Sequence, residues 1–133
     1  RPILDNMIKD YKLTSKAFLL GHQDNVFKYL KYSDCFILSS LWEDPGFVLI
    51  EAGAMNTNII ASNCPNGPQE IICDKDFLFN NGSVDDLLNK FEIFRDKSDI
   101  DLRNQKINIK KKIKFYTSFQ HYKKLDLILN EKN

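Results

Sequence analysis

The sequence has 133 residues, of which 43% are hydrophobic and 28% charged, with a formal net charge of +1. This length fits one domain at most, and ten Phe supply enough apolar side chain for a core. No apolar run approaches the length that crosses a bilayer, and the chain opens in helical spacing rather than with a signal peptide. We therefore expect a cytoplasmic domain, and the absent initiator Met suggests that residues upstream are missing.

The charge is unevenly distributed. Residues 1–102 carry a net charge of −6 and residues 103–133 a net charge of +7. Such a basic tail could contact anionic lipid or nucleic acid. Its lysines interleave with a regular apolar stripe, which favours a solvated helix face. We predict no nucleic-acid partner and keep peripheral contact with a membrane as an open alternative.

The three cysteines are Cys35, Cys64 and Cys73. Their odd number and their spacing fit reduced thiols better than disulfides or metal ligands. Cys35 lies in an apolar run and is expected to be a core residue rather than a nucleophile. The sequence therefore predicts no metal site.

Taken in chain order, the first half alternates helices and apolar runs. Residues 3–13 have helical apolar spacing, and residues 17–20 form a short apolar run typical of a buried parallel strand. A loop follows at 21–24, and Asn25 is a candidate cap for a helix over 26–32. Residues 34–39 read as a second buried strand.

The alternation continues through the second half of the chain. A helix over 47–55 is led in by Pro45 and Gly46, and Asn56 or Asn58 can take the left-handed turn that ends it. The further expected elements are a strand at 58–61, a helix starting at Pro68, a strand at 77–79, and helices capped by Ser83 and Ser98. This order predicts an α/β fold with a parallel sheet and flanking helices.

The chain ends, at about 113–130, in a predicted amphipathic helix. Its apolar side chains recur at helical spacing, so we expect them to face inward. They are Ile113, Tyr116, Phe119, Tyr122, Leu125 and Leu129.

Two carboxylates, Glu43 and Glu51, stand eight residues apart around the strand-to-helix turn after residue 39. Glu43 falls in the loop and Glu51 in the first turns of the helix, so both can face the crevice at the carboxyl edge of the sheet. Gly46 lets the backbone approach a ligand closely. The amides of Gly46, Phe47 and Val48 lie at a helix N-terminus, where unpaired donors and the helix dipole bind phosphate.

Glu51 has two readings. It can accept hydrogen bonds from vicinal hydroxyls, as an acidic residue does for ribose in dinucleotide folds. It can equally be an acid near a helix N-terminus that complements the helix dipole. The spacing of the two acids alone leaves both readings open.

The surrounding residues strongly resemble glycosyltransferase family 4. The resemblance is carried by residues 39–52 (SSLWEDPGFVLIEA), 58–62 (NIIAS) and 67–72 (GPQEII). Less specific similarity extends to residues 18–21, 33–40 and 115–122, so that it covers about residues 3–130. The family has the GT-B fold, and the resemblance implies that residues 1–133 are part of its C-terminal, nucleotide-sugar-binding half. Residues 1–112 would be Rossmann-like, and the helix at 113–130 would close the domain.

The resemblance also implies a function. The family is retaining and transfers a sugar from a nucleoside-diphosphate sugar, typically without a metal cofactor. The acceptor would be a glycan or a lipid-linked molecule, and the pathway that of a cell-surface polysaccharide or lipopolysaccharide. The enzyme would be cytoplasmic, with the inner face of the cell membrane as a place of action.

By resemblance, Glu51 would bind the ribose and Glu43 the hydroxyls of the transferred sugar. Gly46 and the amides of Phe47 and Val48 would face the sugar and diphosphate. The loop that contains His22 would lie near the nucleobase, although a surface-loop histidine is an equal reading. Asp44 could contact the sugar, but we favour a role in shaping the loop.

The sequence also departs from the family pattern. Many relatives have Gly directly after the first Glu, where this chain has Asp44 and Pro45. The Arg and Lys that bind the diphosphate, and the acceptor-binding half, are not in this chain. In the family's sheet the missing strands lie between the one at 17–20 and the one at 35–39. We therefore expect a domain truncated on its N-terminal side, inactive and marginally stable or prone to aggregate when isolated.

Two other classes remain as alternatives. A nucleotide-sugar epimerase of GT-B fold shares the architecture but lacks the block from Glu43 to Glu51. A non-catalytic, flavodoxin-like binding domain shares the parallel sheet. A receiver-type domain of this class would have an acidic cluster after its first strand, which this sequence lacks.

Overall fold

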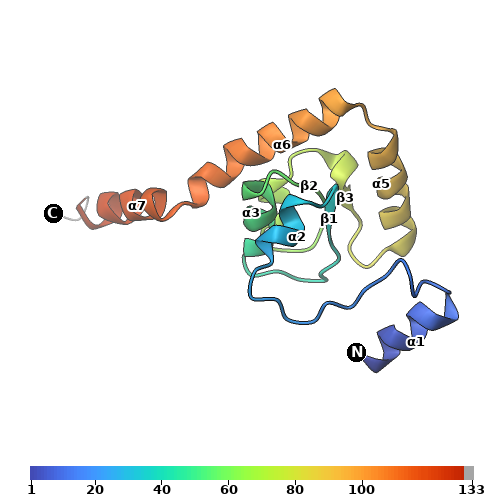
Figure 1. Ribbon diagram of the computed structural model, residues 1–133. Helices are drawn as coiled ribbons and strands as arrows, with labels where there is room; N and C mark the ends of the chain where they lie inside the picture. The colour runs from blue at the N-terminus through green and yellow to red at the C-terminus, as the bar shows by residue number, and fades with distance from the viewer. Residues whose placement is uncertain (131–133) are drawn as a thin grey trace.

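The computed structural model describes residues 1–130, which form a small parallel sheet flanked by helices (Figure 1). Strands β1 (Cys35–Leu38), β2 (Asn58–Ser62) and β3 (Leu78–Phe79) pair in the order β1-β2-β3, all parallel. Every residue of β2 is buried, as expected for the middle strand of a sheet covered on both faces. The predicted α/β class is confirmed.

Helices precede, connect and follow the three strands and pack around the sheet. They are α2 (Phe27–Lys31), α3 (Phe47–Ala54), α4 (Pro68–Ile71), α5 (Val84–Asp96) and α6 (Asp99–Ile113), with a 3-10 turn, η1 (Lys75–Phe77), before β3. Helix α1 (Pro2–Asp10) and, after a second 3-10 turn η2 (Lys114–Tyr116), helix α7 (Ser118–Asn130) extend from the body of the domain at its two ends (Figure 1).

The core lies between the sheet, α3 and α6. Leu49, Ile60 and Ile109 are almost fully buried there. A Cβ at Gly53 would lie 2.5 Å from Cγ2 of Ile109, so the absence of a side chain allows α3 and α6 to pack closely. Gln105 fastens α6 to the middle strand, since its side chain donates to the carbonyl of Ile59 at 2.7 Å and accepts from the same residue's N–H at 3.3 Å.

Most of the predicted helix ends are confirmed. The hydroxyls of Ser83 and Ser98 each accept a hydrogen bond from a backbone N–H three residues on, at 3.2 Å, and cap α5 and α6. Pro68 occupies the first position of α4, and Asn56 takes the left-handed turn after α3. The predicted cap at Asn25 is wrong: Val26 precedes α2, and no side chain caps that helix.

The strand predicted at 17–20 does not form. These residues run as irregular chain, with the Phe18 side chain 70% exposed. A short strand is stable only with a neighbour that satisfies its N–H and C=O groups. No strand among residues 1–130 pairs with it, and the carbonyl of Leu19 accepts instead from the Arg1 guanidinium at 3.1 Å.

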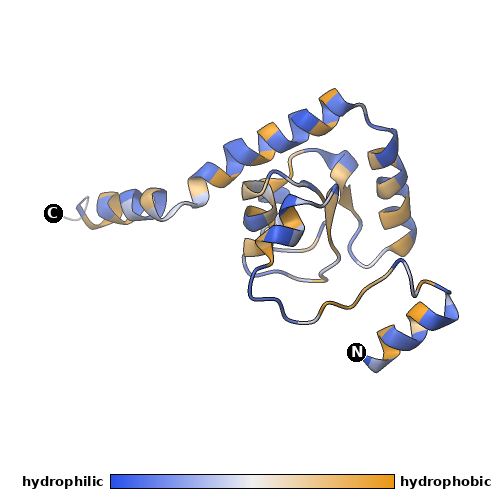
Figure 2. Cartoon of the chain, viewed as in Figure 1, coloured by the Kyte–Doolittle hydropathy of each residue, from blue (hydrophilic) through white to orange (hydrophobic). Residues whose placement is uncertain are grey.

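The predicted single helix at 113–130 also needs correction. The 3-10 turn η2 breaks it, and α7 begins at Ser118 and projects away from the sheet (Figure 1). The residues expected to face inward are mostly exposed, including Tyr116, Phe119, Tyr122, Leu125 and Leu129. Apolar residues lie along the outer helices α1 and α7 in Figure 2. The apolar residues of α7 form a face that another element could cover, but no element of the described chain covers it.

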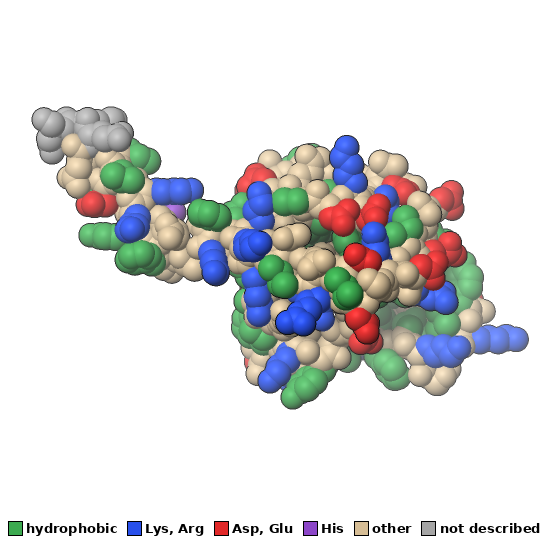
Figure 3. All heavy atoms as spheres, turned by 90° about the horizontal axis from the view of Figure 1, so that it is seen from above, with side chains coloured by type: hydrophobic (Ala, Val, Ile, Leu, Met, Phe, Trp, Pro, Cys, Tyr) green, Lys and Arg blue, Asp and Glu red, His purple; other side chains and the backbone are tan. Residues whose placement is uncertain are grey.

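The charged side chains are also distributed unevenly over the surface of the molecule. Lys and Arg side chains are frequent over α6 and toward α7, whereas Asp and Glu side chains gather toward the α5 end (Figure 3). Helices long and apolar enough to pass through a bilayer are not found in the portion of the chain covered by the structure.

The isolated chain is expected to be marginally stable and to aggregate at micromolar concentration. β1 lies at an edge of the sheet with Ile37 41% exposed, and apolar side chains on residues 17–20 and α7 are uncovered. Uncovered edges and apolar patches of this kind promote association. Sedimentation and chemical unfolding of the 133-residue chain would check this. A monomer with a reversible, two-state transition at high stability would contradict it.

Candidate functional site

The loops that follow β1 and β2 meet at the carboxyl edge of the sheet. The backbone N–H of Glu43 donates to the carbonyl of Pro65 at 3.4 Å. Gly67 lies so close to Pro45 that a Cβ there would be 2.5 Å from the Pro45 carbonyl oxygen. The hydroxyl of Ser62 donates to the carbonyl of Ser40. The two loops therefore form one packed unit at the place where open parallel sheets bind ligands.

A third loop supports this unit. The side-chain amide of Asn81, which follows β3, donates to the carbonyl of Leu41 at 2.8 Å. The loops after all three strands are thus linked by hydrogen bonds, which holds the backbone around Glu43 in place.

Gly46 is the residue at which the first loop turns into α3. It is buried and has φ 77° and ψ 45°, a left-handed conformation that favours glycine. A Cβ at this position would lie 3.7 Å from Oε2 of Glu43, so that carboxylate lies beside the first turn of α3. No side chain among residues 1–130 caps the helix. The N–H of Leu49 donates to the Gly46 carbonyl at 3.0 Å, which leaves the amides of Phe47 and Val48 available.

The structure brings most of the predicted site residues together. Glu43 and Val48 are half-buried, whereas Asp44 is exposed and joined to Pro45 by a cis peptide bond. Phe47, the first residue of α3, is 63% exposed. Glu51 is half-buried and lies four residues after Phe47. It is therefore on the same face of α3 as Phe47, one turn further along the helix.

His22 is not part of this cluster. It lies in the irregular segment before α2, and its side chain is 91% exposed. Its Nε2 lies 3.5 Å from a carboxylate oxygen of Asp24. Within residues 1–130, no hydrogen bond connects His22 to the loops after β1 and β2.

A pocket beside the Glu43 loop was not predicted from the sequence. It has a volume of about 290 Å³ and is formed by residues 63–67, 69 and 70, among them Asn63, Asn66 and Gln69. Gln69 donates from Nε2 to Oδ1 of Asn63. The sequence could have indicated this pocket, because three carboxamide side chains follow the buried strand β2. Polar residues that follow a strand lie at the carboxyl edge of a parallel sheet, where ligands bind.

Glu70 has a partner that the sequence did not indicate. Tyr116 in η2, 46 residues further along the chain, donates its hydroxyl to Oε2 of Glu70 at 2.8 Å. Partial burial and this hydrogen bond raise the pKa of Tyr116 above its ordinary value. The contact ties the start of the C-terminal segment to the pocket beside Glu43. Glu70 and Tyr116 also line a neighbouring groove of about 960 Å³, together with Phe47 and Tyr122.

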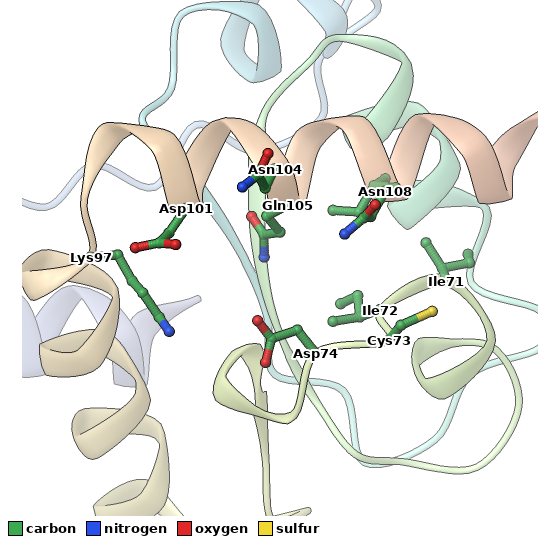
Figure 4. Close-up of a pocket in the computed structure, with 10 residues that line it drawn as sticks. Ile71, Ile72, Cys73, Asp74, Lys97, Asp101, Asn104, Gln105 and Asn108 are labelled. Atoms are coloured by element: carbon green, nitrogen blue, oxygen red, sulfur yellow. The ribbon is translucent and has the colours of Figure 1, made fainter.

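A separate polar pocket lies between α6 and residues 71–74, with a volume of about 320 Å³ (Figure 4). Its lining residues do not come from the loops after β1 and β2. Two of its polar side chains already have partners: Lys97 pairs with Asp76 at 2.5 Å, and Gln105 binds the backbone of Ile59. We therefore place the candidate site at the carboxyl edge of the sheet and not here.

Cys35 should react with alkylating agents far more slowly than Cys73. Burial raises the pKa of Cys35 from 9.0 to about 11, with Asp34 adding to the effect and a backbone hydrogen bond from Ile60 opposing it. Because the raised pKa lowers the thiolate fraction, its rate near pH 8 should be about a hundredfold below that of an unshifted thiol.

Mass-spectrometric mapping of iodoacetamide labelling between pH 7 and 11 would measure both rates. Cys73, which is exposed, provides the internal control. Equal rates at the two thiols would contradict the buried environment of Cys35.

Comparison with known proteins identifies the family of this chain. The sequence model of the family described as glycosyl transferases group 1 matches residues 3–113. An uncharacterized glycosyltransferase of Methanocaldococcus jannaschii is 44% identical over 70 residues, which are 53% of this chain and 17% of that protein.

Two further relatives have more specific names. An N-acetylgalactosamine-N,N'-diacetylbacillosaminyl-diphospho-undecaprenol 4-alpha-N-acetylgalactosaminyltransferase of Campylobacter jejuni is 31% identical over 53% of this chain and 20% of its own length. A UDP-Gal:alpha-D-GlcNAc-diphosphoundecaprenol alpha-1,3-galactosyltransferase of Escherichia coli is 31% identical over 63% of this chain and 22% of its own. The chain spans about a fifth of the length of the curated relatives it matches.

The fold has a counterpart among solved structures. The crystal structure of a glycosyltransferase from Rickettsia africae superposes with a TM-score of 0.71 at 21% identity, over 84% of this chain and 31% of that one. This likeness supports a Rossmann-like half of a GT-B fold. Since the family match covers residues 3–113, the chain belongs to the group 1 glycosyltransferases.

Proposed function

We propose that this chain is the donor-binding half of a retaining glycosyltransferase that uses a nucleoside-diphosphate sugar. The observation that carries the proposal is the position of the Glu43 carboxylate beside Gly46, at the uncapped start of α3. Glu51 follows one turn along the same helix. An acid, a helix N-terminus and a second acid in this order suit a ligand with hydroxyls at both ends and a diphosphate between them.

Each group has a role in this proposal. The amides of Phe47 and Val48 and the dipole of α3 stabilise the diphosphate, whose negative charge increases as the bond to the sugar breaks. Glu51 accepts hydrogen bonds from the ribose hydroxyls. Glu43 accepts hydrogen bonds from hydroxyls of the transferred sugar and so orients it. Asp44 shapes the loop. The loop that contains His22 stands apart from these residues and is proposed only to contact the nucleobase of the bound donor.

The transfer itself needs no nucleophile from the protein. The acceptor oxygen forms a bond to the anomeric carbon on the face from which the diphosphate leaves. The leaving phosphate oxygen takes the proton of the acceptor hydroxyl, so the configuration of the sugar is retained. The contribution of this chain is to position the donor and to stabilise the leaving charge.

The names of the relatives support a lipid-linked acceptor. The Campylobacter jejuni and Escherichia coli enzymes are both named for acceptors carried on undecaprenol diphosphate. We propose an acceptor of the same kind, in the synthesis of a cell-surface glycan, at the cytoplasmic face of a membrane. A further domain would bind it, together with the cationic residues that complete the diphosphate site. The isolated chain should therefore not catalyse transfer.

The test uses the full-length protein that contains this chain, incubated with a panel of UDP- and GDP-sugars. Release of UDP or GDP, with a glycosylated lipid-diphosphate product, is the expected result. Release should persist in EDTA, because we propose no metal cofactor. A full-length protein that neither binds nor consumes any nucleotide sugar would overturn the proposal.

A further inference from the structure

We propose that the pocket formed by residues 63–70 binds a neutral sugar ring directly beside Glu43. This inference rests on the proposed function and extends it to residues that have no assigned role. The ring is either the sugar being transferred or the sugar at the end of the acceptor. Both present the same chemistry, a ring of hydroxyl groups that each donate and accept a hydrogen bond.

The side chains of Asn63 and Gln69 are oriented for such a ligand. Nε2 of Gln69 donates to Oδ1 of Asn63. This leaves Oε1 of Gln69 as an acceptor and the amide N–H groups of Asn63 as donors. A hydroxyl group can pair with one of each. The hydrogen bond between the two exposed amides favours this orientation before a ligand arrives, which lowers the entropic cost of binding.

Two further polar groups line the same pocket. Glu70 receives the Tyr116 hydroxyl on Oε2, and Oε1 has capacity to accept a ligand hydroxyl. Asn66 has φ 63°, a left-handed conformation that Asn adopts more readily than most residues, and its side chain is exposed at the pocket.

The charge of the pocket selects a neutral ligand. Its lining contains three carboxamides and one carboxylate, and no Lys or Arg within the described residues. A phosphate group would be repelled by Glu70 and would find no cation to pair with. The volume of about 290 Å³ is near the lower limit of ligand pockets, about 300 Å³, and suits a single ring better than an oligosaccharide.

The position of the pocket connects it to the donor site. It follows β2, the neighbour of β1, and therefore lies on the β2 side of the Glu43 loop. The hydrogen bond from Glu43 to Pro65 and the close packing of Gly67 on Pro45 join the loop after β1 to the loop after β2, which forms the pocket. The N–H of Asn63 donates to the carbonyl of Phe79 at 2.7 Å, which anchors the start of the loop to β3.

The test compares two variants of the full-length protein with a matched control. Gln69→Ala removes one amide of the pair, and Asn66→Gly removes a side chain while keeping the left-handed backbone accessible. Asn89→Ala removes an exposed amide on α5, outside the pocket. Since a neutral hydrogen bond contributes modestly, each pocket variant should raise one KM about two- to tenfold. The control should leave both KM values unchanged.

The two sources of the ring give different results. If the pocket holds the transferred sugar, the KM for the donor rises while affinity for free UDP or GDP stays constant. If it holds the acceptor sugar, the KM for the acceptor rises while hydrolysis of the donor without acceptor stays constant. Pocket variants that melt at the parent temperature and leave both KM values unchanged would overturn the inference.

A second readout does not depend on turnover. Saturation-transfer NMR with methyl glycosides should show binding to the full-length protein, weakened in both pocket variants and retained in Asn89→Ala. A protein that binds no nucleotide sugar but retains this pattern would refute the proposed function and leave the sugar pocket standing. Absence of any glycoside signal, or a signal equal in all variants, would refute the pocket.

Discussion

Replacing Glu51 by Ala in the full-length protein is expected to raise the KM for the nucleotide-sugar donor about ten- to a hundredfold. A hydrogen bond to a charged acceptor contributes about 1.5–3 kcal/mol, which corresponds to this range of affinity. Glu51 is half-buried on α3, and its carboxylate has no hydrogen bond or ion pair within residues 1–130. The group is therefore free to bind a ligand.

The same variant separates the two readings of Glu51. If the carboxylate only complements the helix dipole, its removal would lower the thermal stability of the protein and leave the KM for the donor unchanged. The position argues against that role, since the dipole effect is confined to the first turn and α3 has no acidic residue in its first turn. Donor KM, calorimetric binding of UDP or GDP, and thermal unfolding would distinguish them. An unchanged KM would refute the ribose assignment.

Glu43→Ala provides the comparison within the site. Glu43 is proposed to orient the transferred sugar, so this change should suppress release of UDP or GDP while affinity for the free nucleotide changes little. The two acids should thus differ: Glu51→Ala acts chiefly on donor affinity and Glu43→Ala on turnover. Two variants that both turn over like the parent would show that the site is elsewhere.

The Gly67→Ala change is expected to have the second large effect, on both stability and donor binding. Gly67 has φ 120°, outside the regions that residues with a side chain favour, and strain of this kind costs about 1–3 kcal/mol. The added Cβ would also lie 2.5 Å from the Pro45 carbonyl oxygen. Backbone cannot rotate away as a side chain can, so the Glu43 and Pro65 loops must separate.

Gly82→Ala is the matched control for this prediction. Gly82 also has positive φ, 77°, but a Cβ there would meet only Cδ2 of Leu41, at 3.7 Å. A side chain there meets milder conformational strain, because φ 77° lies near the left-handed region, and it meets no clash. We expect Gly67→Ala to lower the melting temperature more than Gly82→Ala does, and to weaken donor binding as well. Equal losses in the two variants would mean that the contact between the loops is unimportant for the site.

Several features followed from local sequence and are present in the structure. Ser83 and Ser98 cap their helices because the hydroxyl and the N–H it accepts from are three residues apart. The apolar runs at β1 and in the middle of β2 predicted strands of a parallel sheet, but only β2 is buried throughout, because β1 lies at the edge with Ile37 41% exposed. Gly46 between a strand and a helix predicted the turn beside which Glu43 lies. In the caps and in the turn, the interacting groups are near neighbours in the chain.

Other features depended on partners far away in the sequence. Residues 17–20 have the composition of a strand but remain irregular, because a strand also needs a neighbour to bind. The stripe on α7 predicted an apolar face but not its direction, which the η2 turn sets. The pocket of Asn63, Asn66 and Gln69 arises because Gly67 packs on Pro45 and Tyr116 binds Glu70.

The sequence by itself thus determined the order of helices and strands from α2 to α6, and it contains the pair of acids Glu43 and Glu51. The order rests on periodicity, caps and spacing, which act over a few residues, whereas the family was indicated by the resemblance of residues 39–72 to its motifs. Only the tertiary structure decided which apolar segments are covered and which polar side chains share a pocket. Burial and hydrogen bonding between distant segments depend on which loops meet, and local sequence does not specify that.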